Sequence, residues 1–273
     1  MQRSSTDKRH FIIAGVLVVV VSLALYALLY VALPLPLQAS TQAATIDWVF
    51  QAHMILLSVL FALVVVFMMY AVVVFRRKDG DSSEGEHFEG NTPLEIAWTV
   101  LPLIAVVIFG YIGVTSLRTV TAAQENEVVV DVEGFQWAWA FTYPDTGAAS
   151  ADLVLPVNQP ARMEMTSRDV IHSFWVPEFR VKQDAVPGQT TVLRFTPTVE
   201  GEYTLVCAEL CGLTHYNMIA KVKIVSQEEY AQWQQVQLAA MGKTAVRWHR
   251  PGGAATSPNQ AAPPADRATA AIY

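Results

Sequence analysis

Charged residues are scarce in this sequence. Only 15% of its 273 residues are Asp, Glu, Lys or Arg, while 53% are hydrophobic. A chain with so little charge is too apolar for an ordinary soluble domain, so the composition indicates membrane-spanning segments joined to one globular unit. The formal net charge is −6. Nucleic-acid-binding proteins usually carry a basic surface. Because the net charge of this chain is negative, no nucleic-acid partner is expected.

Three segments contain no charged residue at all: 11–33, 54–75 and 96–117. Each is long enough to cross roughly 30 Å of hydrocarbon as a helix. Basic residues flank the first two segments at one end only, and they are Arg3, Lys8, Arg9, Arg76, Arg77 and Lys78. Because basic flanks stay in the cytoplasm, everything that follows Leu117 is expected outside the cytoplasmic membrane of a prokaryote.

The first apolar segment has two interpretations. Its basic flank and the small residues Thr41 and Ala43 are typical of a cleavable signal peptide, whereas its length favours a retained helix. The division expected for the whole chain is an extra helix or signal at 1–45, a transmembrane hairpin at 46–118, a β domain at 119–226, a short helix at 227–241 and a disordered tail at 242–273. The tail prediction follows from its Ala, Pro, Gly and Thr content.

Short alternating stretches replace the long apolar runs between Glu127 and Val225. This pattern predicts a Greek-key β-sandwich of roughly 100 residues with about seven strands. Strands are expected near Glu127 and Phe135 and at 152–155, 162–166, 191–196, 202–206 and 219–225. Every second residue from Phe135 to Tyr143 is aromatic, which predicts one strand with five aromatic side chains on the same face, most of them for packing.

The sequence has only two cysteines, and neither belongs to a Cys-x-x-Cys-His motif, so no haem attachment to this chain is expected. Both lie in Cys207-Ala-Glu-Leu-Cys211-Gly-Leu-Thr-His215-Tyr-Asn-Met218, between two predicted strands. Thiolate, imidazole and thioether groups are the soft ligands that copper prefers. A single blue copper site needs one Cys, so the second Cys indicates two coppers that share both thiolates.

A dinuclear site needs a second imidazole, and the β domain contains one further histidine, His172. The other four histidines fall at the termini or in the membrane-associated part. Two alternatives remain. A disulfide between Cys207 and Cys211 would suit an oxidising compartment but leaves the remaining soft donors unexplained. The spacing could also mark one face of a helix, although the flanking β patterns and Gly212 argue against that.

With these residues in place, the sequence closely resembles cytochrome c oxidase subunit II over about residues 47–233. The family's pattern Cys-x-Glu-x-Cys-Gly-x-x-His-x-x-Met is matched at every fixed position, and the upstream Val-Ile-His element is present. The resemblance also includes Leu-Glu-Ile-Ala-Trp-Thr from Leu94 and Val-Lys-Gln-Asp-Ala-Val-Pro-Gly from Val181. One departure is Ala138, which stands where many relatives have an aromatic residue between two tryptophans.

The resemblance implies a set of metal ligands. Cys207 and Cys211 would be bridging thiolates, His172 and His215 terminal imidazoles, and Met218 a weak axial ligand. Glu209 would offer its backbone carbonyl to copper, and its carboxylate would reach a Mg or Mn ion shared with subunit I, since hard ions prefer oxygen. Three further positions match family residues: Trp137 where electrons enter, Glu95 at the mouth of a proton path, and Asp169 for donor docking.

The implied function is electron transfer. Such a subunit accepts electrons from cytochrome c or another small carrier at the copper centre. It passes them to the haem-copper subunit I of a proton-pumping oxidase that reduces oxygen to water, and a subunit III is expected in the same complex. Residues 119–226 carry thirteen acidic and seven basic side chains, an excess of six negative charges that would attract a basic donor.

Other functions fit parts of the sequence. A copper subunit of a nitric oxide reductase would look nearly the same, and a membrane-anchored cupredoxin carrier would need no oxidase partner. A quinol oxidase subunit has a similar architecture without the copper ligands, which are all present here. A disulfide-stapled binding module on a membrane anchor would bind no copper, so copper content separates it from the others.

Overall fold

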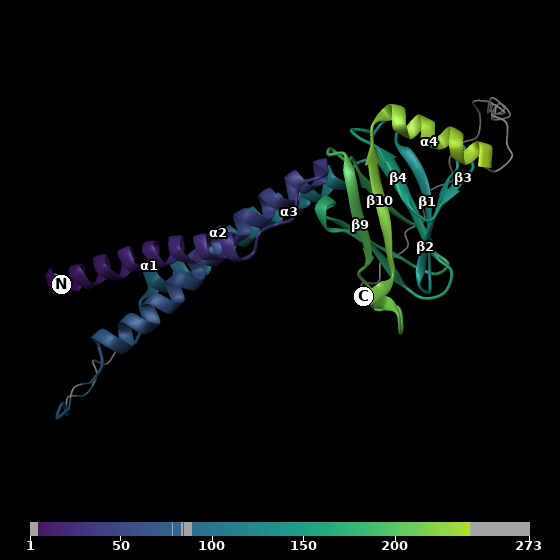
Figure 1. Ribbon diagram of the computed structural model, residues 1–273. Helices are drawn as coiled ribbons and strands as arrows, with labels where there is room; N and C mark the ends of the chain where they lie inside the picture. Colours follow the sequence, from purple (N-terminus) through teal and green to yellow (C-terminus); the bar gives the residue numbers. More distant parts are fainter. Residues whose placement is uncertain (1–4, 78, 83, 85–88, 241–273) are drawn as a thin grey trace, which may run out of the picture.

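The computed structural model describes residues 5–77, 79–82, 84 and 89–240. Figure 1 shows three long helices that form a stalk, with a β domain at one end of it. The N-terminus lies at the far end of the stalk, away from the β domain. The basic residues Arg3 and Lys78 and the tail predicted at 242–273 lie outside the described residues.

The stalk consists of α1 (Ser5–Ala32), α2 (Thr41–Val74) and α3 (Thr92–Thr121). All three are long and apolar enough to cross a membrane. The predicted membrane anchor is therefore confirmed, with three helices in the described chain. α2 begins well before residue 54, where the uncharged segment starts, because its first turns contain polar side chains that are buried against the β domain. Ser40 caps this extension, and its hydroxyl accepts a 3.0 Å hydrogen bond from the Ala43 N–H.

The linker between α1 and α2 is bound to the β domain. The Ala39 N–H donates to the carbonyl of Glu178 at 3.0 Å, and the Thr198 N–H donates to the carbonyl of Ala39 at 2.9 Å. Arg180 donates from Nε to Oδ1 of Asp47 on α2 at 2.8 Å, and both side chains are only 9% exposed. A buried ion pair is costly to break on one side. These contacts fix the β domain at the end of the stalk.

The β domain has two five-stranded sheets packed face to face, which confirms the predicted sandwich. The first sheet has the order β3-β2-β1-β5-β8, formed by Ala148–Ser150, Ala138–Tyr143, Val128–Phe135, Ala161–Ser167 and Thr191–Phe195. The second has the order β4-β10-β9-β6-β7, formed by Leu153–Pro156, Ile219–Val225, Gly201–Cys207, His172–Val176 and Val181–Ala185. Two short 3₁₀ helices, η1 (Pro177–Phe179) and η2 (His215–Asn217), and helix α4 (Gln227–Ala240) complete the described domain.

The prediction of about seven strands was too low, since the described chain forms ten. The three strands that it missed are β3, β6 and β7. β3 is only three residues long, and β6 is buried at four of its five positions. A strand buried on both faces does not alternate between apolar and polar residues, so the alternating pattern could not reveal it.

The prediction of a single strand from Phe135 to Tyr143 was wrong. Phe135 ends β1 and pairs with Ala138, the first residue of β2, so Gln136 and Trp137 form a tight turn between them. The aromatic alternation runs on through this turn, which contains neither Gly nor Asn to mark it. Trp139, Phe141 and Tyr143 on β2 do share one face and lie in the core, 0–3% exposed.

Tyr143 also protects the edge of the second sheet. Its hydroxyl accepts from the Val154 N–H and donates to the Val154 carbonyl, both at 2.8 Å. β4 pairs with β10 on one side only. The hydroxyl therefore satisfies backbone groups on the side of β4 that has no neighbouring strand.

Tyr143→Phe is expected to destabilise the domain by about 1–3 kcal/mol, because it leaves two buried backbone groups unsatisfied while keeping the ring. The measurement is urea unfolding of the domain, with Tyr216→Phe as a control, since Tyr216 is 82% exposed. Equal unfolding midpoints for the wild type and Tyr143→Phe would contradict this interpretation.

Candidate metal centre

The cysteine loop joins β9 to β10 at one end of the sandwich, opposite the end at which α4 begins (Figure 1). β9 ends at Cys207, and β10 begins at Ile219. The Cys207 N–H donates to the Met218 carbonyl at 3.1 Å, which holds the two ends of the loop together. Apart from η2, the loop has no helical structure. The alternative of a helix face is therefore wrong.

The loop brings four soft donor atoms to one place. The two cysteine Sγ atoms are 3.8 Å apart. The Sγ of Cys211 lies 3.4 Å from Nδ1 of His215 and 3.7 Å from Sδ of Met218. Cys207, Cys211 and Met218 are buried, whereas His215 is half-buried. The donors predicted from the loop sequence thus converge on one point.

His172 comes from β6, which pairs with β9, so the neighbouring strand supplies the second imidazole. Its side chain is 0% exposed, and its Nδ1 lies 3.9 Å from Sγ of Cys207. His172, Cys207 and Cys211 form a group whose ligand atoms all lie within 4.8 Å of one another. Gly134 leaves room for this ring, because a Cβ at that position would lie 3.0 Å from Cδ2 of His172.

Asp169 fixes the orientation of this imidazole. Its Oδ1 lies 2.8 Å from Nε2 of His172, so Nε2 carries the proton and the lone pair on Nδ1 faces the sulfur atoms. Burial alone would raise the pKa of Asp169. Hydrogen bonds from the Gln136 N–H, the His172 ring and the Val170 N–H outweigh burial and lower the pKa to about 2. Asp169 is therefore charged at neutral pH.

This contact was not predicted from the sequence. The resemblance implied only a docking role for Asp169, whereas its carboxylate binds His172 in the structure. The spacing of three residues between an Asp and a predicted ligand His was the only available signal. Replacing Asp169 would consequently change the ligand His172 as well as the surface charge.

Glu209 takes part through its backbone. Its carbonyl oxygen lies 3.3 Å from Sγ of Cys207, and the residue is exposed. The cysteines are free thiols, and their separation of 3.8 Å is well above the roughly 2.05 Å of an S–S bond. Burial raises the pKa of the Cys211 thiol to about 11, and the nearby Cys207 adds to the shift. This set of sulfur, nitrogen and carbonyl donors fits copper.

Trp137 and Glu95 lie in very different places. The turn that carries Trp137 rests on the cysteine loop: Gln136 donates from Nε2 to the Cys211 carbonyl at 2.7 Å. A Cβ on Gly212 would lie 2.9 Å from Nε2 of Gln136 and 3.3 Å from the Trp137 ring, and the φ of 121° at this position also favours glycine. Trp137 is 37% exposed. Glu95 is in the first turn of α3, where its carboxylate accepts from the Asn91 N–H at 3.1 Å, and it is not part of the metal site.

Two family models match the chain. One, described as cytochrome c oxidase subunit II, periplasmic domain, matches residues 148–225, and the other, described as its transmembrane domain, matches residues 28–119. The chain is 32% identical to cytochrome c oxidase subunit 2 of Synechocystis sp. over 73% of this chain and 74% of that protein. It is 33% identical to cytochrome c oxidase subunit 2 of Cereibacter sphaeroides over 71% of this chain and 77% of that protein.

One solved structure is similar to part of the chain. The periplasmic domain of subunit II of the cytochrome oxidase of Bradyrhizobium japonicum is 29% identical to this chain, with a TM-score of 0.42. The match covers 44% of this chain and 99% of that structure.

Copper binding is expected to weaken in acid. The Cys211 thiol must lose its proton to become a ligand, so each proton that copper displaces lowers the affinity about tenfold per pH unit as the pH falls. A competition titration with a Cu(I) chelator at about pH 6 and about pH 8 measures this effect. An affinity that does not change with pH would contradict thiolate ligation.

Proposed function

The chain belongs to the cytochrome c oxidase subunit II family, and on this premise we propose that it accepts electrons at a dinuclear copper centre and delivers them to subunit I. The family places the chain in a haem-copper oxidase, an oxidoreductase complex that implies a subunit I partner. The observation that carries the proposal is the convergence of His172, Cys207 and Cys211 within 4.8 Å.

Six donors would hold the metal. Cys207 and Cys211 would share their thiolates between two coppers. His172 lies beside Cys207 and His215 beside Cys211, so each imidazole would serve one copper. Met218 and the carbonyl of Glu209 would be the weak ligands. When bound, the copper pair supplies a site that takes up and releases one electron with little structural change.

The protein keeps these donors rigid before any metal binds. Asp169 holds the His172 ring in one tautomer, and the Cys207–Met218 hydrogen bond fixes the ends of the loop. Met218 is completely buried, which restricts its side chain. A rigid donor set supports rapid electron transfer because few atoms have to move when the charge changes.

Electrons would enter through Trp137. Its ring contacts the cysteine loop at Gly212 and is partly exposed, so it lies between solvent and the donors. The donor would be cytochrome c or another small carrier, attracted by the six excess negative charges of residues 119–226. Asp169 would contribute to docking, because its side chain remains 31% exposed.

The remaining assignments concern the complex and its membrane. The copper domain would lie on the outer face of a prokaryotic plasma membrane, since Lys8, Arg9, Arg76 and Arg77 lie at helix ends away from the β domain, whereas α3 has only Arg118 at the end next to it. Glu95 would face a proton path, and the exposed carboxylate of Glu209 would bind Mg or Mn at the border with subunit I. A subunit III would complete a proton-pumping oxidase that reduces oxygen to water. We divide the chain at residues 45, 118, 226 and 241, as the sequence suggested.

Metal analysis tests the copper proposal. We expect two coppers per chain in the wild type and a loss of the centre in Cys207→Ser and Cys211→Ser, because thiolates hold the metal. Met218→Leu should keep both coppers but shift the reduction potential, since axial ligands tune rather than retain the metal. One copper per wild-type chain would rule out the dinuclear centre.

Two tryptophans of nearly equal exposure, Trp137 at 37% and Trp175 at 38%, provide a matched test of electron transfer from the donor. Trp137→Phe should slow electron uptake from reduced cytochrome c several-fold without changing copper content, whereas Trp175→Phe should have little effect.

Raising ionic strength above about 0.1 M should slow association with a basic donor, because charges further apart than about 10 Å are then screened. Equal rates for both variants, or rates that do not respond to salt, would contradict the proposed docking region.

A further inference from the structure

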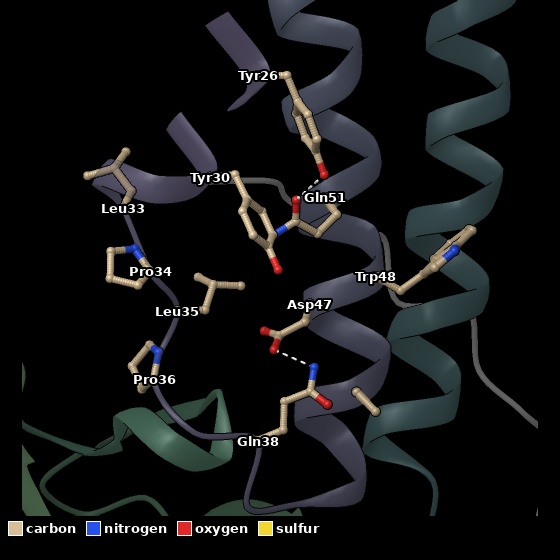
Figure 2. Close-up of a pocket in the computed structure, with 11 residues that line it drawn as sticks. Tyr26, Tyr30, Leu33, Pro34, Leu35, Pro36, Gln38, Asp47, Trp48 and Gln51 are labelled. Atoms are coloured by element: carbon tan, nitrogen blue, oxygen red, sulfur yellow. Dashed lines mark hydrogen bonds between the residues drawn. The ribbon is translucent and has the colours of Figure 1, made fainter. Parts of the chain in front are cut away.

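A pocket of about 540 Å³ lies where α1, its linker and α2 meet the β domain. Figure 2 shows it between two aromatic side chains of α1 and the polar face of α2. Its volume is within the range of small-molecule sites in proteins. The electron-transfer proposal does not use this pocket.

The two helices form the pocket with regularly spaced residues. Tyr26 and Tyr30 are four residues apart and share one face of α1, and Leu33 follows three residues later, just beyond the end of that helix. Gln51 and Asp47 are likewise four residues apart on α2. The pocket is closed at the stalk end by the Tyr26 hydroxyl, which donates to Oε1 of Gln51 at 3.0 Å. The linker, with Pro34 and Pro36, forms another wall.

At the end next to the β domain, Gln38 donates from Nε2 to Oδ2 of Asp47 at 2.7 Å. Asp47 is the only charged residue that lines the pocket. Its charge is balanced from outside by Arg180, whose Nε donates to Oδ1 at 2.8 Å. The lining therefore has no cation that could bind a phosphate headgroup. A headgroup with an ammonium group is also disfavoured, because the Asp47 carboxylate is already paired with Arg180. The pocket suits an uncharged polar group.

The remaining lining residues indicate which uncharged group fits. Tyr30 is 63% exposed and offers aromatic surface against which the C–H groups of a sugar ring can pack. Trp48 lies at the edge of the pocket, with its ring toward α3 (Figure 2). Figure 2 shows the Tyr30 hydroxyl pointing toward Asp47 and the Gln51 amide beside it. Together they provide donors and acceptors for several hydroxyl groups.

The position of the pocket near the expected membrane surface indicates that its ligand belongs to a lipid. It lies at the end of two apolar helices, where aromatic side chains usually meet the membrane surface. Exposed apolar side chains on the same face of α1 as Tyr26 and Tyr30, such as Val19 at 58% and Leu23 at 65%, continue along the stalk and would face acyl chains. We propose that this pocket binds the uncharged sugar head of a membrane glycolipid.

The test uses the intact oxidase that contains the full chain. The complex is stripped of lipid in an amine-oxide detergent, because a sugar detergent would compete for the pocket. It is then placed in nanodiscs with equal amounts of monoglucosyldiacylglycerol, phosphatidylethanolamine and phosphatidylglycerol of identical acyl chains. Native mass spectrometry should find the glucosyl lipid retained in preference to both phospholipids, and dodecyl maltoside should displace it.

Point variants locate the binding. Tyr30→Phe should weaken retention about 2- to 10-fold by removing one hydrogen bond, and Tyr30→Ala should abolish it by removing the aromatic surface as well. Tyr70→Phe is the matched control, because the Tyr70 hydroxyl bonds with His10 at 2.7 Å, near the opposite ends of α1 and α2. Retention in this control should equal that of the wild type.

Several outcomes would overturn the proposal. One is that the wild type retains a phospholipid as well as it retains the glucosyl lipid, and another is that it retains no lipid at all. The others are that Tyr30→Phe retains as much glucosyl lipid as the wild type, or that Tyr70→Phe loses as much as Tyr30→Phe. An intact mass that lacks α1 would also overturn it, because α1 forms half of the pocket. Copper content should stay at the wild-type level in all three variants, so failure here is distinguishable from failure of the electron-transfer proposal.

Discussion

The structure depends on one constraint: a short loop between two paired strands must place two thiols, an imidazole and a thioether around one point. The hydrogen bond between the Cys207 N–H and the Met218 carbonyl fixes the ends of that loop. The pairing of β6 with β9 then brings His172 to the same point from a neighbouring strand. The sandwich core behind these strands resists rearrangement, since a close-packed interior deforms little. Every part of the proposed electron path rests on this rigidity.

The residues that converge at the candidate site could be predicted from the sequence, because their chemistry and spacing are local. Cys207, Cys211, His215 and Met218 lie within one loop, and His172 followed from the need for a second imidazole. The bond between Asp169 and His172 could not be predicted with the same certainty. An acidic residue before a histidine has many possible partners, and only the folded chain decides among them.

The connection between membrane and domain was equally hidden from the sequence. The uncharged segment starts at residue 54 and the transmembrane hairpin was expected from residue 46, whereas α2 begins at Thr41 and contains Asp47. Asp47 is tolerated there because Arg180, 133 residues away in the sequence, neutralises it. The left-handed backbone of Arg180, with φ of 57°, helps to direct its guanidinium toward α2. Long-range ion pairs of this kind override local patterns, and here one of them helps to set the position of the copper domain on its stalk.

Electron paramagnetic resonance of the oxidised, copper-loaded chain tests the central claim most directly. If Cys207 and Cys211 share their thiolates between two coppers, one unpaired electron is spread over both metals. The hyperfine pattern should then show two equivalent copper nuclei. A pattern from a single copper nucleus would contradict the account, because the donor set would then hold an ordinary mononuclear site.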